Sequence, residues 1–229
     1  MTDYKKTLYA AVLLAVLMLL YGCSEDNTKA EGDVVFYVNG DEVTQAELTY
    51  FENSLRAEVM SYFVSEYSAE YSEDFWTCEY NGKTPYAELR SRAIEKCTDA
   101  KLRLALCREY GIYTDISFAA LRQKAEQFNL SAEDSTGPGI TKINMNSFYT
   151  YYLETGELEL VNRMARDKLS ASDADIEEYI SGLNQNDYPE IPADELTVYA
   201  SRRIIAQKYE EYIEQLKKDA VITQETAAR

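Results

Sequence analysis

Hydrophobic residues recur along most of this chain at the spacing of amphipathic helices. The clearest early segment, about residues 45–65, has an apolar side formed by Leu48, Phe51, Leu55, Val59 and Phe63. Side chains three and four positions apart share one face of a helix, so this face is expected to be buried. Thr44 and Glu47 stand at the spacing of a capping box, which predicts that the helix begins directly after Thr44.

Further helices are predicted over most of the remaining chain. Their approximate ranges are 85–110, 117–128, 147–169, 173–180 and 192–218. Pro85 stands at a first helical position and Gly111 where a C-terminal cap is favoured. Residues 66–83 are rich in Tyr, Ser and Glu and are predicted to be irregular or only partly helical. Gly137-Pro138-Gly139 interrupts the helical pattern, and Gly156 is expected to weaken the helix that contains it.

Strand signals lie at the two ends of the helical region. Val34–Val38 and Asp41–Val43 flank Asn39-Gly40, a dipeptide favoured in the two-residue turns of β-hairpins. Ala220–Thr223 follows the last helix and is a candidate closing strand. The fold class predicted from these patterns is mainly α, a multi-helix domain with a small β element.

The first residues have the order of a secretory signal. Lys5 and Lys6 precede the apolar run Leu8–Leu20, which is shorter than the ~20 residues that a transmembrane helix needs. The next segment, Leu20–Cys23, resembles the lipobox of bacterial lipoproteins, in which the cysteine takes a diacylglycerol before the preceding peptide is removed. Lipidation is therefore predicted at Cys23. The alternative is a plain signal peptide followed by an incidental cysteine.

These features divide the chain into three parts. Residues 1–22 are the predicted lipoprotein signal peptide, residues 23–32 a polar flexible tether, and residues 33–229 a helical domain. The expected location is outside the cytoplasm, at the outer face of the cell membrane. A lipid on Cys23 would anchor the protein there without spanning the bilayer.

Composition excludes several classes of function. The chain has 23 Lys and Arg against 40 Asp and Glu, which gives a formal net charge of −17. Because such a surface repels phosphate groups, nucleic acid is not an expected partner. Histidine is absent, which rules out catalytic pairs and metal sites that depend on imidazole. No catalytic residue, metal site or cofactor is predicted.

Three cysteines remain beside Cys23. Cys97 and Cys107 lie on one predicted helix, about 15 Å apart along its axis, which is too far for a disulfide unless the helix breaks. Cys78 could pair with either of them, or the thiols could stay unpaired and buried on a helix face.

Aromatic residues form two candidate peptide-binding groups in a chain with 20 tyrosines. The first group is Phe75, Trp76 and Tyr80, and the second is Phe148, Tyr149, Tyr151 and Tyr152. Neighbouring residues of a helix point about 100° apart, so some rings of the second group are expected to be partly exposed. Tyrosine combines an apolar face with a hydroxyl, which suits loose binding of polypeptides of mixed sequence. The alternative is that these rings pack helices together.

Three segments, in the same order along the chain, resemble the chaperone module of the SurA/PrsA group of extracytoplasmic folding factors. They are Val34–Leu48, Ser170–Tyr179 and Ser201–Ile222. The resemblance implies that the first and last strands pair. Members with prolyl isomerase activity carry a parvulin domain between the last two segments, whereas this chain has only the short connector 184–191. The resemblance therefore implies a chaperone module without the isomerase.

The function predicted from this resemblance is that of a membrane-anchored holdase, a chaperone that binds unfolded or newly exported polypeptides without catalysis. Two alternatives remain. One is a divergent peptidyl-prolyl cis-trans isomerase, although parvulin sites typically use histidines, which this chain lacks. The other is a scaffold lipoprotein that serves one dedicated envelope partner.

Overall fold

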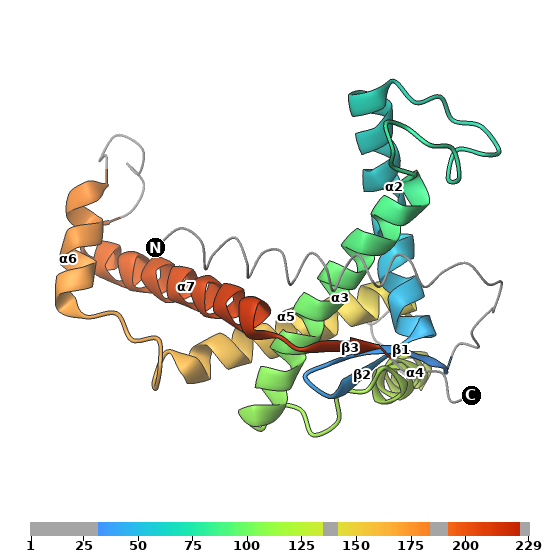
Figure 1. The fold of residues 1–229 in the computed structure, drawn as a ribbon. Coiled ribbons are helices and arrows are strands. Elements are labelled where there is room, and N and C mark those ends of the chain that lie inside the picture. The colour runs from blue at the N-terminus through green and yellow to red at the C-terminus, as the bar shows by residue number, and fades with distance from the viewer. Residues whose placement is uncertain (1–31, 135–141, 184–191, 225–229) are drawn as a thin grey trace. The chain divides into compact units, whose positions relative to one another are not determined.

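The computed structural model describes residues 32–134, 142–183 and 192–224, which form mainly helices and one small sheet (Figure 1). The elements, in chain order, are β1 (Val34–Val38), β2 (Asp41–Thr44), α2 (Gln45–Tyr67), α3 (Pro85–Glu109), α4 (Phe118–Asp134), α5 (Met145–Met164), α6 (Asp173–Gly182), α7 (Ala193–Asp219) and β3 (Ile222–Gln224). The mainly helical fold class is confirmed. The predicted signal peptide, Cys23 and the connector 184–191 lie outside the described residues.

The chain divides into two compact units. Unit 1 contains the described residues up to Lys101, together with 117–134, 142–146 and 220–224. Unit 2 contains 102–116 together with 147–183 and 192–219. Helix α3 thus contributes its first part to unit 1 and its last part to unit 2. No helix in the described parts of the chain is long and apolar enough to cross a membrane.

The sheet of unit 1 joins the two ends of the described chain. Its strand order is β2-β1-β3, and β1 pairs antiparallel with both neighbours (Figure 1). Asn39 and Gly40 have φ angles of 51° and 89°, as the predicted hairpin turn requires. The amide of Asn39 donates to the carbonyl oxygen of Val221 at 2.9 Å, and the Val221 amide donates to Asn39 Oδ1 at 2.8 Å. The pairing of the first and last strands is confirmed.

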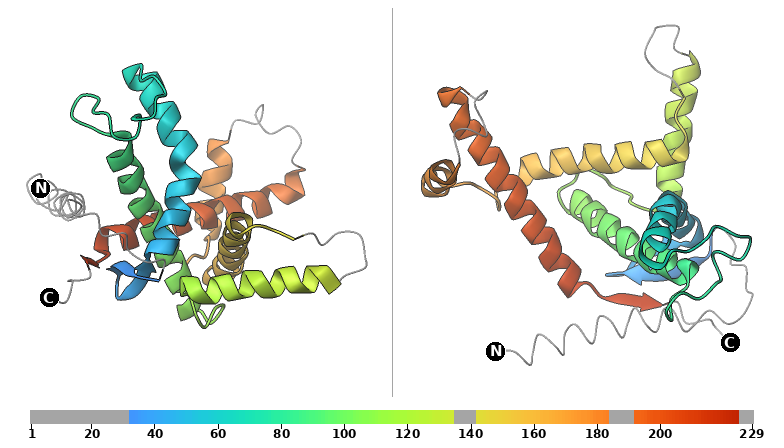
Figure 2. Two further views of the ribbon diagram at one scale, coloured as in Figure 1. Left: turned by 90° about the vertical axis from the view of Figure 1, so that its right-hand side faces the viewer. Right: turned by 90° about the horizontal axis from the view of Figure 1, so that it is seen from above.

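Helix α2 and the first part of α3 run alongside each other in unit 1 (Figure 2). All five apolar positions predicted for the buried side of α2 are buried. Thr44 caps the helix, since its hydroxyl accepts a hydrogen bond from the Glu47 amide. The Glu47 carboxylate pairs with Lys101 of α3 at 2.9 Å, and both side chains are 1% exposed. Burial, together with the nearby Glu47 charge, raises the pKa of the Cys97 thiol well above its ordinary value.

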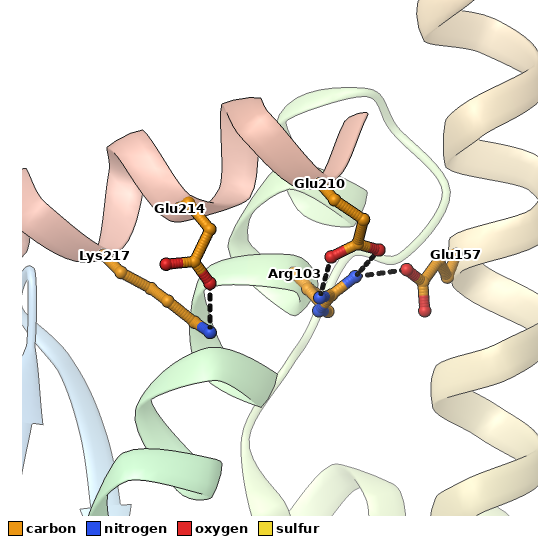
Figure 3. A network of polar contacts seen from close by, with 5 residues as sticks. All are labelled: Arg103, Glu157, Glu210, Glu214 and Lys217. Atoms are coloured by element: carbon orange, nitrogen blue, oxygen red, sulfur yellow. Dashed lines mark hydrogen bonds and ion pairs between the residues drawn. The ribbon is translucent and has the colours of Figure 1, made fainter. Parts of the chain in front are cut away.

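Unit 2 has its own apolar core. Its buried members are Leu106, Cys107, Leu160, Met164, Leu169, Tyr209 and Ile213. Arg103 of α3 connects the helices at the edge of this core, because it binds Glu157 of α5 and also Glu210 of α7, the latter at 3.0 Å (Figure 3). On α7, Lys217 pairs separately with Glu214 at 2.9 Å.

Gly156 of α5 has a packing role that the sequence pattern did not reveal. A Cβ atom at this position would lie 2.6–2.9 Å from two ring carbons and the hydroxyl oxygen of Tyr113. That ring is held in place, because it stacks on Tyr152 at 4.0 Å and its hydroxyl donates to the Tyr152 carbonyl oxygen at 2.7 Å. Glycine therefore lets the Tyr113 ring approach the helix backbone closely.

Two predicted helix ends are wrong. Helix α4 continues to Asp134 rather than ending near 128, since no glycine or proline interrupts residues 129–134. Helix α5 ends at Met164 rather than near Leu169. The Met164 carbonyl oxygen accepts the amides of Lys168 and Leu169 at 2.8 and 2.9 Å, so the chain turns here and buries Leu169 in the core of unit 2. Cys78, Cys97 and Cys107 are all free thiols, which resolves the open question of their pairing.

Candidate functional site

The end of α2 and the segment that joins it to α3, residues 60–84, form what we call the tip (Figure 2). Helix α2 ends at Tyr67 and is capped by Ser68, which takes a left-handed φ of 53° and donates its amide to the Phe63 carbonyl oxygen. A tight turn at Asn81 and Gly82, both with positive φ, brings Tyr80 and Lys83 into two backbone hydrogen bonds of 2.8 and 3.1 Å. The irregular structure predicted for residues 66–83 is thus confirmed from Ser68 onwards, and it is held by defined hydrogen bonds.

An aromatic cluster fills the interior of the tip. Phe63 and Phe75 are both fully buried, and their ring centroids lie 6.4 Å apart in an edge-to-face arrangement. Tyr80 packs edge-to-face on Phe63 at 5.6 Å, and Tyr67 lies 5.1 Å from the same ring. Such contacts add to the stabilisation that comes from burying ring area. The cluster therefore gives the irregular segment a core of its own.

An open apolar groove of about 390 Å³ lies on the surface of the tip. It is lined by Met60, Ser61 and Val64 of α2 and by Tyr71 of the joining segment. Tyr71 is 73% exposed and Val64 is 47% exposed. Tyr71 also contacts the buried ring of Phe75 at 5.8 Å, so the exposed ring is supported from beneath. This groove offers apolar surface to a ligand without any rearrangement of the cluster below it.

Trp76 belongs to the same segment of the tip as Tyr71 and is partly exposed. Its ring packs edge-to-face against Phe75 at 5.2 Å. The guanidinium carbon of Arg56 sits 4.4 Å from the Trp76 ring centroid, a cation–π contact. Because this is the single tryptophan of the chain, its fluorescence reports on the tip alone.

The surface of the tip is strongly acidic. Between residues 66 and 79 the sequence has no Lys or Arg, while its exposed acids are Glu66, Glu70, Glu73, Asp74 and Glu79. None of these five carboxylates forms an ion pair within the described part of the chain. Burial raises the pKa of Tyr80, and the neighbouring Cys78, Asp74 and Glu70 raise it further. The tip therefore combines an apolar groove with unneutralised negative charge.

The second predicted aromatic group lies on α5 in unit 2 and is mostly interior. Phe148, Tyr149 and Tyr152 are buried, with Tyr149 at 0% exposure. Burial raises the pKa of Tyr152 well above its ordinary value and that of Tyr113 to about 12, which agrees with their stacked, enclosed position. Tyr151 is 52% exposed, so the expectation that part of this group is exposed is confirmed.

The seven rings predicted to bind peptide therefore have different positions. Four are buried, namely Phe75, Phe148, Tyr149 and Tyr152, and offer no surface to a ligand in this structure. Trp76, Tyr80 and Tyr151 are at least partly exposed, and a binding role for them stays a prediction. Met60, Val64 and Tyr71 line the groove and were not predicted as binding residues. Val64 falls outside the apolar stripe of α2. An apolar residue outside such a stripe is expected to be exposed, and this was the signal in the sequence that could have identified the groove.

Cys97 and Cys107 are buried and are not placed for nucleophilic chemistry. Burial raises the pKa of the Cys107 thiol to about 12, so at neutral pH both it and Cys97 are protonated thiols rather than nucleophilic thiolates. In residues 32–134, 142–183 and 192–224, no three His, Cys, Asp or Glu side chains are arranged to hold a metal ion.

Comparison with known proteins yields one distant and partial similarity. No protein-family model matches the chain, and no solved structure matches it. Among curated proteins, the "Foldase protein PrsA" of Caldanaerobacter subterraneus subsp. tengcongensis is 26% identical over 123 residues. The match covers 52% of this chain and 38% of that protein. The chain thus resembles a PrsA foldase over about half of its own length.

Proposed function

We propose that this protein is an extracytoplasmic holdase, which binds unfolded or newly exported polypeptides and does not catalyse proline isomerisation. The similarity to a protein named as a foldase is the single observation that carries the proposal, since it points to protein folding as the process. A holdase needs accessible apolar surface and high solubility. It needs no covalent step, metal or nucleotide.

The tip of unit 1 supports this proposal physically. Its groove exposes Val64 and Tyr71, and the buried ring of Phe75 contacts both Tyr71 and the partly exposed Trp76. Exposed apolar surface of this kind is typical of sites that bind other proteins. The net charge of −17 would keep a complex with an aggregation-prone client in solution.

The test is suppression of client aggregation, followed by light scattering. The full chain is reconstituted in lipid nanodiscs, and empty nanodiscs and an equally acidic inert protein serve as controls. We expect suppression near an equimolar ratio to the client. The paired substitution Val64→Ser and Tyr71→Ser should abolish it, whereas Leu158→Ser, at an equally exposed apolar residue of unit 2, should not. No effect of the unmodified protein beyond the controls would overturn the holdase proposal and favour a scaffold with one dedicated partner.

The absence of isomerase activity is a separate part of the proposal. By the resemblance to the SurA/PrsA group, the segment 184–191 would stand where parvulin-containing members carry their catalytic domain, and the chain contains no histidine. The expected rate of cis-trans exchange in a short proline peptide is that of the uncatalysed reaction. Exchange rates above the uncatalysed rate that increase with protein concentration would contradict this part of the proposal and support a divergent isomerase.

Anchoring through Cys23 is proposed from the lipobox-like segment Leu20–Cys23. Mass spectrometry of the mature N-terminus should find a diacylglyceryl cysteine at this position. Cys23→Ser should prevent lipid attachment and leave the protein unprocessed or released from the membrane fraction. A mature N-terminus at another residue would contradict the anchor while leaving the holdase proposal intact.

A further inference from the structure

The tip combines an apolar groove with exposed carboxylates, and a polypeptide that is both apolar and cationic would complement the two. The groove lined by Met60, Val64 and Tyr71 is apolar, and its volume of about 390 Å³ has room for only a few side chains. The five carboxylates of residues 66–79, in the segment that contributes Tyr71 to the groove, are exposed and have no ion-pair partner among the described residues. Apolar contact supplies affinity, whereas charge complementarity supplies selectivity and speeds association.

We propose that the tip groove is where clients dock and that it selects extended segments in which an apolar side chain is flanked by Lys or Arg. This inference rests on the proposed holdase function and names its substrate class. The apolar side chain enters the groove beside Tyr71, and the flanking cations lie near Glu70, Glu73 and Asp74. Charges interact strongly only within a Debye length of about 8 Å at physiological salt, so the flanking residues next to the apolar core count most.

Other occupants of the groove are disfavoured by charge. A second copy of this chain would bring a tip with the same five carboxylates and a net charge of −17 against the first. An anionic membrane surface would meet the same repulsion. Arg56, which lies close by in sequence on α2, has its guanidinium stacked on Trp76. A cationic polypeptide is the partner that the surface complements.

The experiment uses three short peptides that share one apolar core and differ only in flanks of Lys, Ser or Glu. The full chain is held in zwitterionic phosphatidylcholine vesicles, so that the lipid does not attract the cationic peptide. Binding is followed by Trp76 fluorescence, with tryptophan-free peptides, and independently by the anisotropy of a dye on each peptide. Vesicles without protein give the background.

We expect the dissociation constant to rise from the Lys-flanked to the Ser-flanked to the Glu-flanked peptide. The first and last should differ about ten-fold, which is the size of effect that a few partly exposed charge pairs produce. The preference should shrink at high salt, since screening acts on charges and not on apolar contact. Val64→Ser with Tyr71→Ser should weaken all three peptides alike, because it removes the surface that they share.

Two charge variants with the same net charge sharpen the test. Neutralising the tip by Glu70→Gln, Glu73→Gln and Asp74→Asn should make the three peptides bind equally. Neutralising exposed acids of unit 2 instead, by Glu154→Gln, Glu177→Gln and Glu178→Gln, should keep the preference. Equal loss of the preference in both variants would overturn the inference, because net charge alone would then explain it. Circular dichroism verifies that each variant is folded.

The outcomes separate this inference from the function on which it rests. Suppression of aggregation with no dependence on peptide charge would leave the holdase standing and overturn the proposed selectivity. Charge-ordered peptide binding without suppression of aggregation would support the docking site and overturn the holdase. Tip variants that change the sedimentation of the protein but not its peptide binding would assign the groove to a second copy of the chain, which would also overturn the inference.

Discussion

The tip of unit 1 and helix α5 of unit 2 both concentrate aromatic residues, but they expose them to different degrees. In unit 2, Tyr149 and Tyr152 are buried and Tyr151 alone projects outwards from that group. At the tip, buried Phe75 supports Tyr71, which is mostly exposed above it. The difference teaches that density of rings in a sequence does not identify a binding surface. What matters is whether the rings have a packing partner on every side.

The charges of the two regions differ in the same way. Unit 2 neutralises several of its carboxylates internally, as Arg103 does for Glu157 and Glu210 (Figure 3) and Lys208 does for Asp175. The carboxylates of the tip have no such partners among the residues described. Unit 2 therefore pairs some of its carboxylates with its own cations, whereas the five acids of the tip form no ion pair within the described residues.

The largest expected effect separates buried from exposed rings on α5. Tyr149→Ala should lower the free energy of unfolding by about 3–5 kcal/mol, because it removes a fully buried ring. Tyr151→Ala, two positions away and half exposed, should change it by less than about 0.5 kcal/mol. Urea denaturation followed by circular dichroism measures both. A similar loss of unfolding free energy in the two variants would contradict the assignment of Tyr149 to the interior and Tyr151 to the surface.

A smaller loss is expected when the bridging cation of unit 2 is removed. Arg103→Met should cost about 1.5–3 kcal/mol, because it leaves two carboxylates without their charged donor. Lys217→Met, which removes the partner of exposed Glu214, should cost about 0–1 kcal/mol. The same denaturation experiment compares them. If Arg103→Met is as mild as Lys217→Met, the network at the edge of the core does not stabilise unit 2.

Substitution of Gly156 tests the close packing around Tyr113. Gly156→Ala should cost about 1–2 kcal/mol, since overpacking against the held Tyr113 ring outweighs the better helix propensity of alanine. Gly182→Ala is the matched control: no atom lies within 4 Å of its added Cβ, so it should be neutral or stabilising by up to about 1 kcal/mol. The penalty at Gly156 should disappear when Tyr113→Ala is added. If Gly156→Ala is still destabilising when Tyr113→Ala is present, the cause lies in the helix backbone and not in the Tyr113 ring.

The acid range offers a finer probe of charge pairing in unit 2. A hydrogen bond from Lys208 and further ones from Ser172 lower the pKa of Asp175 to about 2, below its ordinary 3.8. Because the folded-state pKa is the lower one, this contribution to stability is present above about pH 4 and is lost as the pH falls towards 2. The pKa of Asp175 is measured by NMR titration of its carboxyl carbon. Lys208→Met should raise the pKa, whereas Lys218→Met, at an exposed lysine of the same helix, should leave it unchanged.

The smallest effect on stability is expected at the tip acids. The combined changes Glu70→Gln, Glu73→Gln and Asp74→Asn should leave the free energy of unfolding within about 0.5 kcal/mol of the original, since these side chains are exposed and form no ion pairs within the described residues. The same variant should lose its peptide charge preference. A large destabilisation would show that these acids serve the fold of the tip rather than a ligand.

Local signals in the sequence were enough for much of the fold. The apolar stripe of α2 and the cap at Thr44 were predicted, and so was the Asn39-Gly40 turn. These features depend on residues within one or two turns of one another. The end predicted for α4 was too early, although no glycine or proline interrupts residues 129–134. The end predicted for α5 was too late, because the chain turns after Met164 and buries Leu169 in the core of unit 2, a tertiary contact that local spacing does not encode.

The candidate site was less predictable. Trp76 and Tyr80 marked the right segment, but Met60, Val64 and Tyr71 were not identified as groove residues. A groove is formed by the gap between elements, and its lining has no periodic pattern that a sequence would display. Burial of Phe148, Tyr149 and Tyr152 likewise depends on what packs around α5, which its own spacing does not contain.

The helical class, the hairpin at the start and the acidic character follow from the sequence, as does the exclusion of chemistry that requires histidine. Each of these follows from residue types or from spacing along a single element. Only the tertiary structure decided which aromatic rings are interior, which thiols stay unpaired and where apolar surface meets uncompensated charge. These properties arise from contacts between residues distant in the chain, and such contacts exist only after the chain has folded.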